Sequence, residues 1–408
     1  GGGIKRQPGH GVERRMQGHQ ALGRHQAVRG AQAPEPGVAG RHAGGASRVG
    51  AQRKVHQPRG HRGTRAAGRS AGHAFRRGAV DGCAVVRVVA VQAVGQLVGE
   101  HLAHERGTGT QQLRDDGAVL QVRDGYDLIV TTDTMVSGTH FFPDDDPRAL
   151  GHKLVAVNVS DLAAMGAEPA WLSLALTLPS VDENWLSAFA AGLHETAEYY
   201  NCQLIGGDTT RGPLSLTMVA KGIVPRGKAI SRSGAKVGDY IYVTGTLGDA
   251  ALGLRLCQGL HEVSKKHQTH ILQRFHYPAA RVALGQALRN IASSAMDLSD
   301  GLYGDIQHIM ARSNVGASID INKLPLSQAL KDSCDSTTAI QLALSGGEDY
   351  ELLFTVPEAR RGSLDVLLSP YGIPLSCIGR ITGAAGKLEL KQAEQQYAYQ
   401  HNGFKHFS

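Results

Sequence analysis

The chain has 408 residues, of which 41% are hydrophobic and 19% charged, and its formal net charge is +7. This length and apolar content predict two or three domains with cores of their own. No run of about 18 or more apolar residues occurs, which argues against a membrane-spanning helix. The five cysteines are scattered and form no Cys-x-x-Cys pair, so we expect free thiols in a reducing, cytoplasmic environment.

The positive charge is confined to the first part of the chain. Residues 1–112 hold 18 Lys and Arg against 5 Asp and Glu, whereas the remainder is acidic. This segment is of low complexity, and Phe75 is its only aromatic residue, so it lacks the apolar surface needed to fold. One interpretation is a basic tail that binds nucleic acid. We favour a disordered or wrong-frame translated segment, because Arg with almost no Lys is what a GC-rich gene yields out of frame.

From residue 113 the composition becomes that of a mixed α/β protein. Apolar alternation predicts strands, and apolar residues at helical spacing predict helices. The expected strands of the first half are Asp127–Asp133, Trp171–Leu178, Cys202–Ile205 and Leu214–Val224, and the expected helices are Asp146–Met165 and Glu183–Tyr200. The basic, Gly-containing stretch Arg226–Gly238 is typical of a connector, so we divide the region into domains at residues 113–230 and 231–408.

The second half repeats this mixture of elements. Its expected strands are Tyr240–Thr244, Ala295–Asp297, Ser318–Ile321, Tyr350–Val356 and Cys377–Ile381, and its expected helices are Leu247–Gln258, Ala279–Ala292 and Asp300–Arg312. Ser299 or Asp300 is the expected N-cap of the last helix, because such side chains accept hydrogen bonds from the first amides. The predicted fold class is α/β (α+β) with two domains.

Aspartates recur where predicted strands end or turn into helices. They occur in Thr131–Thr134, Ser160–Asp161, Gly206–Thr210 and Asp297–Gly301. A single Asp of this kind is usually a cap or a turn residue. Several such carboxylates gathered in one cleft would repel one another without cations, and oxygen ligands of this kind suit Mg²⁺. The pattern therefore predicts magnesium-assisted phosphoryl transfer, which needs no covalent nucleophile.

Two common kinase architectures are absent from the sequence. No Gly-x-x-x-x-Gly-Lys-Ser/Thr motif and no protein-kinase motif set occurs. A turn at Gly206-Gly207-Asp208 would let backbone amides approach a phosphate. Arg232, in the connector, is either a phosphate clamp or a solvated charge.

Several longer motifs, in order, resemble the thiamine-monophosphate kinase family. They are Asp115–Leu120, Thr131–Thr134 with His140-Phe141, Val157–Ala167, Gly206–Thr210, Ser231–Gly234 with Gly238-Asp239, Asp297–Leu302, Ser345–Leu352 and Gly403–Phe407. The resemblance covers residues 113–408. It implies the two-domain fold of the aminoimidazole ribonucleotide synthetase-like superfamily, with a C-terminal α/β domain and a homodimer in which the N-terminal sheets pair.

The family's functional residues carry over position by position. The resemblance implies magnesium ligands at Asp116, Thr131, Thr132, Asp133, Asp161, Asp208, Asp297 and Asp300, of which Asp133, Asp161, Asp208 and Asp300 act in catalysis. It implies ATP contacts at Gly207, Asp208, Arg232 and Ser299, and thiamine monophosphate contacts at His140, Glu348 and Phe404. An aromatic face such as that of Phe404 suits the cationic thiazolium. The expected reaction is direct in-line transfer of the γ-phosphoryl of ATP, with several Mg²⁺ ions, to thiamine monophosphate.

The first motif departs from the family's pattern. The family has Gly-x-Gly-Asp-Asp there, whereas Leu113-Arg114 precede Asp115-Asp116 in this chain. A Gly lets the backbone approach a metal or phosphate, so metal binding at Asp116 is the weakest expectation of the set. Another ATP-using member of the superfamily remains an alternative, although the cysteines that selenophosphate synthetase and hydrogenase-maturation relatives use are missing. A nucleic-acid-binding protein acting through residues 1–112 is the non-enzyme alternative.

Overall fold

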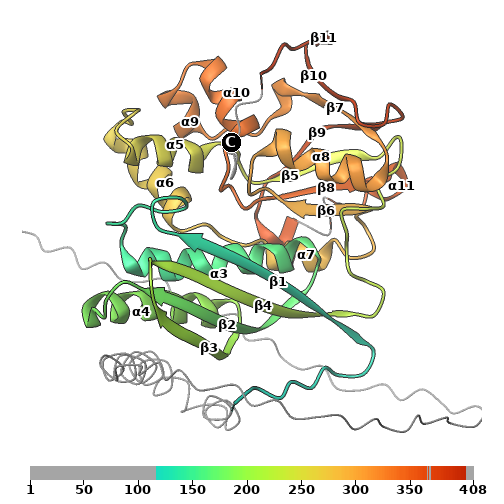
Figure 1. Ribbon diagram of the computed structural model, residues 1–408. Coiled ribbons are helices and arrows are strands. Elements are labelled where there is room, and N and C mark those ends of the chain that lie inside the picture. Colours follow the sequence, from blue (N-terminus) through green and yellow to red (C-terminus); the bar gives the residue numbers. More distant parts are fainter. Residues whose placement is uncertain (1–115, 365, 367–368, 401–408) are drawn as a thin grey trace, which may run out of the picture. The chain divides into compact units, whose positions relative to one another are not determined.

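The computed structural model describes residues 116–364, 366 and 369–400 (Figure 1). The predictions made for residues 1–112 and for Phe404 lie outside the described residues. No helix within the described ranges is long and apolar enough to cross a membrane.

The first half of the described chain is a four-stranded sheet covered on one face by two helices (Figure 1). In chain order its elements are β1 (Tyr126–Val136), α3 (Pro147–Ala164), β2 (Glu168–Leu178), α4 (Glu183–Tyr199), β3 (Gln203–Arg211) and β4 (Ser215–Pro225). The strand order is β1-β4-β2-β3, in which β2 and β3 are parallel and the other two pairs are antiparallel. This order places β1 and β3 at opposite edges of the sheet.

Helix α3 is buried almost throughout because it packs on several partners at once. It contacts β1, β2 and β4 of its own sheet, α4 beside it, and α6, α7 and β6 of the second half. Its crossing with α4 is close: a Cβ at Gly192 would lie 1.9 Å from the carbonyl oxygen of Arg148. Asp146 caps the helix by accepting from the amide of Arg148. Helix α3 is thus the element shared by the two halves.

The second half is a seven-stranded mixed sheet flanked by helices. Its strands are β5 (Tyr240–Thr244), β6 (Ser294–Asp297), β7 (Gly316–Asp320), β8 (Leu352–Val356), β9 (Leu375–Thr382), β10 (Leu388–Gln392) and β11 (Gln395–Gln396), in the order β11-β10-β7-β9-β5-β8-β6. Its helices are α5 (Asp249–Cys257), α6 (Lys265–His276), α7 (Val282–Ala287), α8 (Leu302–Ser313), α9 (Gln328–Ser333), α10 (Ser336–Ser345) and α11 (Glu358–Arg361), with short 3₁₀ turns at Ile321–Lys323 and Ser369–Tyr371. The edge strand β6 is the one that meets α3.

Most expected elements are confirmed, but two details of the acidic motifs are wrong. Asp133 and Asp208 do not end their strands: they lie inside β1 and β3, which continue to Val136 and Arg211. The strands continue because their β-branched Thr residues suit extended backbone and ladder pairing reaches Val136 and Arg211. The expected Gly206-Gly207-Asp208 turn is therefore part of β3.

Candidate active site

Two carboxylates are anchored where the last turns of α3 meet an edge strand of each sheet. On the β1 side, the hydroxyl of Thr131 donates a short hydrogen bond to the carboxylate of Asp161. On the β6 side, the buried hydroxyl of Ser160 donates to Asp297 over 2.7 Å. Successive residues of α3 thus bond to opposite halves of the molecule, and the carboxylates of Asp161 and Asp297 are brought close together.

Asp133 is held against the same helix through its backbone. Its N–H donates to the side-chain oxygen of Asn158 over 3.1 Å, and the Asn158 amide donates to the carbonyl of Leu154 over 2.9 Å. Asn158 is completely buried, so its orientation is fixed by these two bonds. Asn158 was not among the expected site residues, although an Asn within a helical apolar pattern needs a specific partner.

The loop after β6 presents Ser299 and Asp300 through an arrangement that differs from the expected one. The N-cap of α8 is Gly301, with φ of 99°, and not Ser299 or Asp300. The carboxylate of Asp305, in the first turn of the helix, instead accepts the N–H groups of Ser299 and Asp300 over 3.0 and 3.1 Å. Asp305 thus fixes the backbone of Ser299 and Asp300, and both residues line the adjacent pocket.

The carboxyl groups of this region raise one another's pKa values. Burial, followed by the charges of Asp161 and Asp300, raises the pKa of Asp133 to about 6. Burial and Asp161 also raise the pKa of Asp297, against the lowering effect of the Ser160 hydrogen bond. Burial and Asp300 raise the pKa of Asp305 to about 7, and Arg232 opposes this rise. The cluster is therefore a place where cations would be favoured.

The donor set fits magnesium only in the presence of other ligands. Within the described ranges, no group of three or more His, Cys, Asp and Glu side chains could by itself hold a metal ion. Mg²⁺ is commonly bound through one or two carboxylates, with waters and substrate phosphates completing its shell. Carboxylate and hydroxyl oxygens at Asp133, Asp161, Asp297 and Thr131 are donors of the required type, so the residues would fit Mg²⁺ if waters and substrate supplied its other ligands.

A pocket of about 830 Å³ opens beside the acidic cluster. Six residues expected at the site line it: Thr132, Asp133, His140, Ser299, Asp300 and Glu348. Part of the sequence-based set is therefore gathered around one cavity, from β1, the loop after β1, the loop after β6 and the Gly346–Tyr350 segment.

Lys153 and Tyr350 line the same pocket and were missed by the sequence analysis. Lys153 is buried in α3, forms an ion pair with Glu348 and lies over the ring of Phe275, with Nζ 4.2 Å from the ring centre. Burial, then Glu348, Asp133 and two further aspartates, raise the pKa of Tyr350. A Lys among the apolar positions of a predicted helix was the signal that could have identified Lys153.

His140 is oriented by the chain that precedes it. Its Nδ1 accepts the N–H of Val136 over 3.0 Å, which fixes the ring at the turn after β1. This bond defines Nδ1 as an acceptor, so the neutral ring carries its proton on Nε2.

Asp208 is not brought to the acidic cluster. Cross-strand partners share a face of a sheet, and the register runs Thr134–Thr217–Ala175–Asp208. Side chains alternate along β1, so Asp208 shares its face with Thr134 and points away from the face of Asp133. The two strands are also three strand spacings apart, about 14 Å. A metal ion cannot therefore bridge Asp133 and Asp208 of one chain.

Three further expected residues lie outside the acidic cluster. Gly207 faces β2, where a Cβ would lie 1.9 Å from the carbonyl oxygen of Leu174, so a packing reason for this Gly exists beside any contact with ATP. Arg232 is exposed in the connector, near enough to Asp305 to affect its pKa. Asp116 is exposed at the beginning of the described chain.

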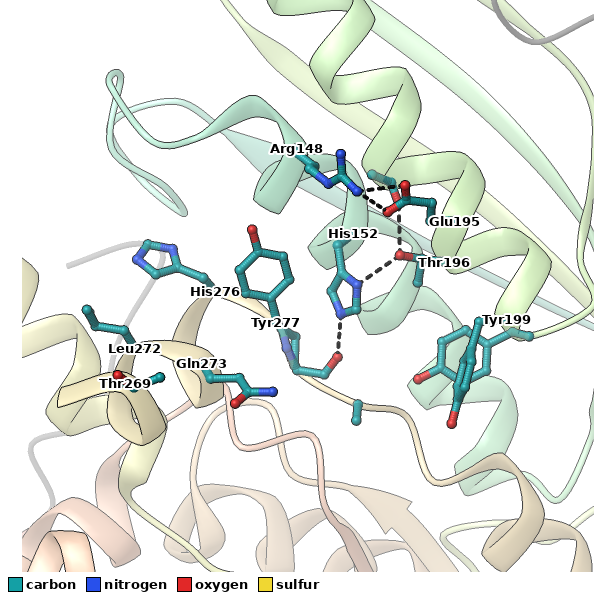
Figure 2. A pocket seen from close by; sticks show the side chains of 14 residues that line it. Arg148, His152, Glu195, Thr196, Tyr199, Thr269, Leu272, Gln273, His276 and Tyr277 are labelled. Carbon is teal, nitrogen blue, oxygen red and sulfur yellow. Dashed lines mark hydrogen bonds and ion pairs between the residues drawn. The ribbon is translucent and has the colours of Figure 1, made fainter. Parts of the chain in front are cut away.

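A second cavity, of about 870 Å³, lies between α3, α4 and α6 (Figure 2). Its polar groups bond to one another: Arg148 pairs with Glu195 at 2.7 Å, and His152 bonds to Thr196 and to the carbonyl of Pro278. Burial lowers the pKa of His152, which keeps its ring neutral. With its charges paired and without a carboxylate cluster, this cavity offers less for phosphoryl transfer than the acidic pocket.

Comparison with known proteins agrees with this fold. The model of AIR synthase related protein, N-terminal domain, matches residues 114–224, and that of the C-terminal domain matches residues 236–391. The thiamine-monophosphate kinase of Salmonella typhimurium is 51% identical over 295 residues, which are 72% of this chain and 91% of the relative.

Two solved structures have the same fold and substantial identity. The thiamine-monophosphate kinase of Stenotrophomonas maltophilia superposes with a TM-score of 0.66 at 42% identity, covering 76% of this chain and 97% of that one. AaThiL complexed with AMPPCP and TMP superposes with a TM-score of 0.62 at 33% identity, covering 70% and 89%. By its sequence identity and by its two-domain AIR synthase-like fold, the chain belongs to the thiamine-monophosphate kinase family.

Proposed function

We propose that the chain transfers the γ-phosphoryl group of ATP to thiamine monophosphate, producing thiamine diphosphate and ADP. The observation that carries this proposal is the 51% identity with a named thiamine-monophosphate kinase across 91% of that enzyme. The acidic pocket supports it, because Asp133, Ser299 and Asp300 lie on the same cavity as His140 and Glu348. The complex of a related structure with AMPPCP and TMP shows that both kinds of ligand bind to this fold.

The reaction is a direct displacement. An oxygen of the phosphate of thiamine monophosphate forms a bond to the γ-phosphorus, while the bond from that phosphorus to the β–γ bridging oxygen breaks and ADP leaves. The attacking oxygen is already anionic, so the chain needs no strong general base. Its task is to bring two polyanions together in line.

The two ends of the pocket have different roles in this proposal. Ser299 and Asp300, with the nearby Arg232, hold the ATP end. His140 and Glu348 hold the acceptor, and Phe404, outside the described residues, is expected to join them. The Lys153–Glu348 ion pair fixes the Glu348 carboxylate, which can then accept from a donor of the substrate's pyrimidine.

Magnesium, when bound, supplies the positive charge that the two substrates lack. Asp133, Asp161, Asp297 and Asp300, with the hydroxyl of Thr131, would hold it, and the mutual rise of the carboxyl pKa values supports that assignment. Asp116 and Thr132 remain proposed ligands on the strength of the family resemblance alone.

We also propose a homodimer formed through the face of the first sheet that no described helix covers. That face carries exposed apolar side chains, with Leu128 at 42% and Val130 at 54% exposure. Asp208 lies on this same face of the sheet. If Asp208 binds metal and ATP as proposed, it must do so together with groups other than the acidic cluster of its own chain. The four described cysteines are free, which suits a cytoplasmic enzyme.

Formation of thiamine diphosphate from thiamine monophosphate, ATP and Mg²⁺ tests the function directly. We expect metal-dependent product that EDTA abolishes and that falls by orders of magnitude in Asp161→Asn. Asp124→Asn is the matched control, because Asp124 is an exposed turn residue before β1. A soluble, folded chain that forms no thiamine diphosphate would refute the proposal.

A further inference from the structure

The segment that carries Glu348 has an unfavourable backbone conformation. Glu348 and Tyr350 have φ values of 71° and 49°, in the left-handed region that non-Gly residues rarely adopt. Backbone bonds join this segment to the loop after β6: Glu348 donates to Ser299 over 2.8 Å, and Tyr350 donates to Leu298 over 2.8 Å. A conformation of this kind persists only where the surroundings enforce it.

Asp349, between these two residues, ties the segment to α5. Its carboxylate oxygens accept the N–H of Gly248 over 3.1 and 2.9 Å, at the N-cap of that helix. Asp349 is 3% exposed, whereas Glu348 lines the pocket. The two consecutive side chains therefore have different roles: Glu348 lines the cavity, and Asp349 anchors the segment to α5.

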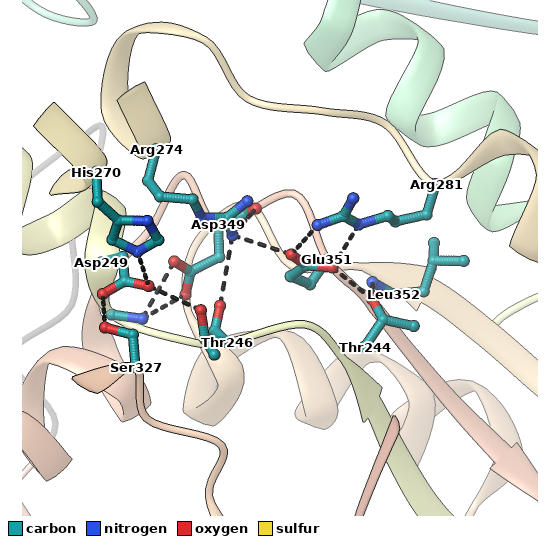
Figure 3. A network of polar contacts seen from close by, with 11 residues as sticks. Thr244, Thr246, Asp249, His270, Arg274, Arg281, Ser327, Asp349, Glu351 and Leu352 are labelled. Carbon is teal, nitrogen blue, oxygen red and sulfur yellow. Dashed lines mark hydrogen bonds and ion pairs between the residues drawn. The ribbon is translucent and has the colours of Figure 1, made fainter. Parts of the chain in front are cut away.

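Glu351 is the centre of a buried ionic network behind the pocket (Figure 3). Its carboxylate, 1% exposed, accepts from Thr244 over 2.6 Å, from Arg281 Nε over 2.7 Å and from Arg274 over 3.0 Å. These hydrogen bonds and both guanidinium groups outweigh burial and lower the pKa of Glu351. The carboxylate is thus charged and fully bonded.

Arg274 connects this centre to the strained segment. In addition to Glu351, it donates to the carbonyl oxygens of Asp349 over 3.2 Å and Thr246 over 3.4 Å (Figure 3). Its neighbour on α6, Phe275, lines the pocket beneath Lys153. Adjacent residues of α6 therefore hold both members of the Lys153–Glu348 pair. Arg274 bonds to the backbone next to Glu348, and Phe275 contacts Lys153 inside the pocket.

We propose that Arg274, Arg281 and Glu351 are positioning residues for Glu348, and that they set the affinity for the acceptor substrate. Ionic networks of this kind are not needed for stability alone, because apolar side chains of similar size often serve as well. This network holds the carbonyl group of Asp349 in place, and with it the backbone of the segment that carries Glu348. The inference rests on the proposed function, because it takes Glu348 as a contact of thiamine monophosphate.

Arg274→Lys tests the proposal, because it keeps the charge and removes the guanidinium, whose Nη2 lies within reach of all three acceptors. We expect the KM for thiamine monophosphate to rise roughly tenfold or more, as the loss of a charged hydrogen bond predicts, while the KM for ATP stays within about twofold. Glu351→Gln, which keeps the volume, should show the same split. Arg380→Lys is the matched control, since Arg380 lies on the surface in an exposed pair with Glu358.

Calorimetric titration of the folded variants with thiamine monophosphate, in the absence of ATP, gives a second readout that needs no turnover. Weaker binding in both variants, with normal ATP affinity, supports the positioning role. If the KM and the affinity for thiamine monophosphate are unchanged, or if affinity falls equally for both substrates, the positioning role is refuted. The proposed function still stands in that case, provided that the wild type turns over. Absence of thiamine diphosphate formation by the wild type would refute the proposed function and this inference with it.

Discussion

Ser160, on α3, donates a buried hydrogen bond to Asp297, on β6, over 2.7 Å. Through this bond the N-terminal half of the described chain fixes a carboxylate that belongs to the C-terminal half. The bond also favours the charged form of Asp297, because it opposes the rise in pKa that burial causes. The acidic cluster is thus assembled by contacts between the halves and not by either half alone.

Replacing Ser160 should weaken metal binding and stability together. Ser160→Ala removes the hydroxyl that donates to Asp297, so the pKa of Asp297 rises further and Mg²⁺ must displace a more tightly held proton. We expect the half-saturating Mg²⁺ concentration for activity to increase severalfold, and urea unfolding to show a loss of about 1–2 kcal/mol. Ser363→Ala, at an exposed position, is the control. An unchanged Mg²⁺ requirement would exclude Asp297 from metal binding.

The stabilising effect of Mg²⁺ should increase with pH. Asp133 and Asp305 have pKa values of about 6 and about 7, above the ordinary value of 3.8. The folded chain therefore binds protons more tightly than the unfolded chain, and without metal its free energy of unfolding falls as pH rises through this interval. Because Mg²⁺ competes with the proton of Asp133, a proposed ligand, the rise in Tm on adding Mg²⁺ should be larger near pH 8 than near pH 5. Thermal melts at both pH values, with EDTA as reference, check this; equal rises would contradict it.

Breaking the Lys153–Glu348 pair should be more harmful than removing both charges. Lys153→Met leaves a partly buried carboxylate without its cation, which typically costs about 3–5 kcal/mol. In the double variant Lys153→Met/Glu348→Gln no charge is left unpaired, so most of the stability should return while acceptor binding stays poor. Chemical unfolding and the KM for thiamine monophosphate separate the two effects. If the double variant is no more stable than the single one, the ion pair is not what Lys153 contributes.

The contact between α3 and α7 should tolerate no additional carbon. A Cβ at Gly285 would lie 1.9 Å from the carbonyl oxygen of Ala163, so Gly285→Ala should force the helices apart and destabilise the fold by several kcal/mol, on the order of an overpacked core. Gly304, within α8, has no atom within 4 Å of an added Cβ. Gly304→Ala should therefore stabilise the protein by about 0.5–1 kcal/mol. Thermal or urea unfolding of the two variants should move in opposite directions.

The proposed dimer predicts a specific sensitivity on the first sheet. Val130→Lys places a charge on the face that no described helix covers and should shift the protein toward a monomer in light scattering at fixed concentration. Val237→Lys is matched to it, because Val237 is 65% exposed but lies in the connector. Monomer from both variants, or from neither, would argue against this face as the interface.

Local pattern was sufficient to predict most of the framework. Strand β5 was predicted with its bounds, and α3 and α4 were predicted within a residue or two, because their apolar spacing and caps are strong signals. Helix α6 was missed because its buried residues are only His267, Ile271 and Phe275 in an otherwise polar segment. Helix α10 was missed because it is short and its first turn contains Thr337 and Thr338, a residue type that favours strands.

The site was predictable in composition but not in arrangement. Each acidic motif could be recognised by itself, yet the sheet order that separates Asp133 from Asp208 depends on pairings between distant segments. Lys153 was overlooked for a similar reason: its partner, Glu348, lies 195 residues further along the chain. Tertiary partners of this kind leave almost no trace in local spacing.

The opposite faces of β1 have a consequence for how this gene can change. Thr131, Asp133 and Met135 point toward the helices, and Thr132 and Thr134 alternate with them. Loss or gain of one codon upstream of Asp133 within this strand would slide the register and exchange the two sets. The pocket would then lose its carboxylate to the outer face while the protein kept its composition. A point substitution in β1 removes single contacts, whereas a one-residue deletion would exchange the side chains that face the helices with those on the outer face.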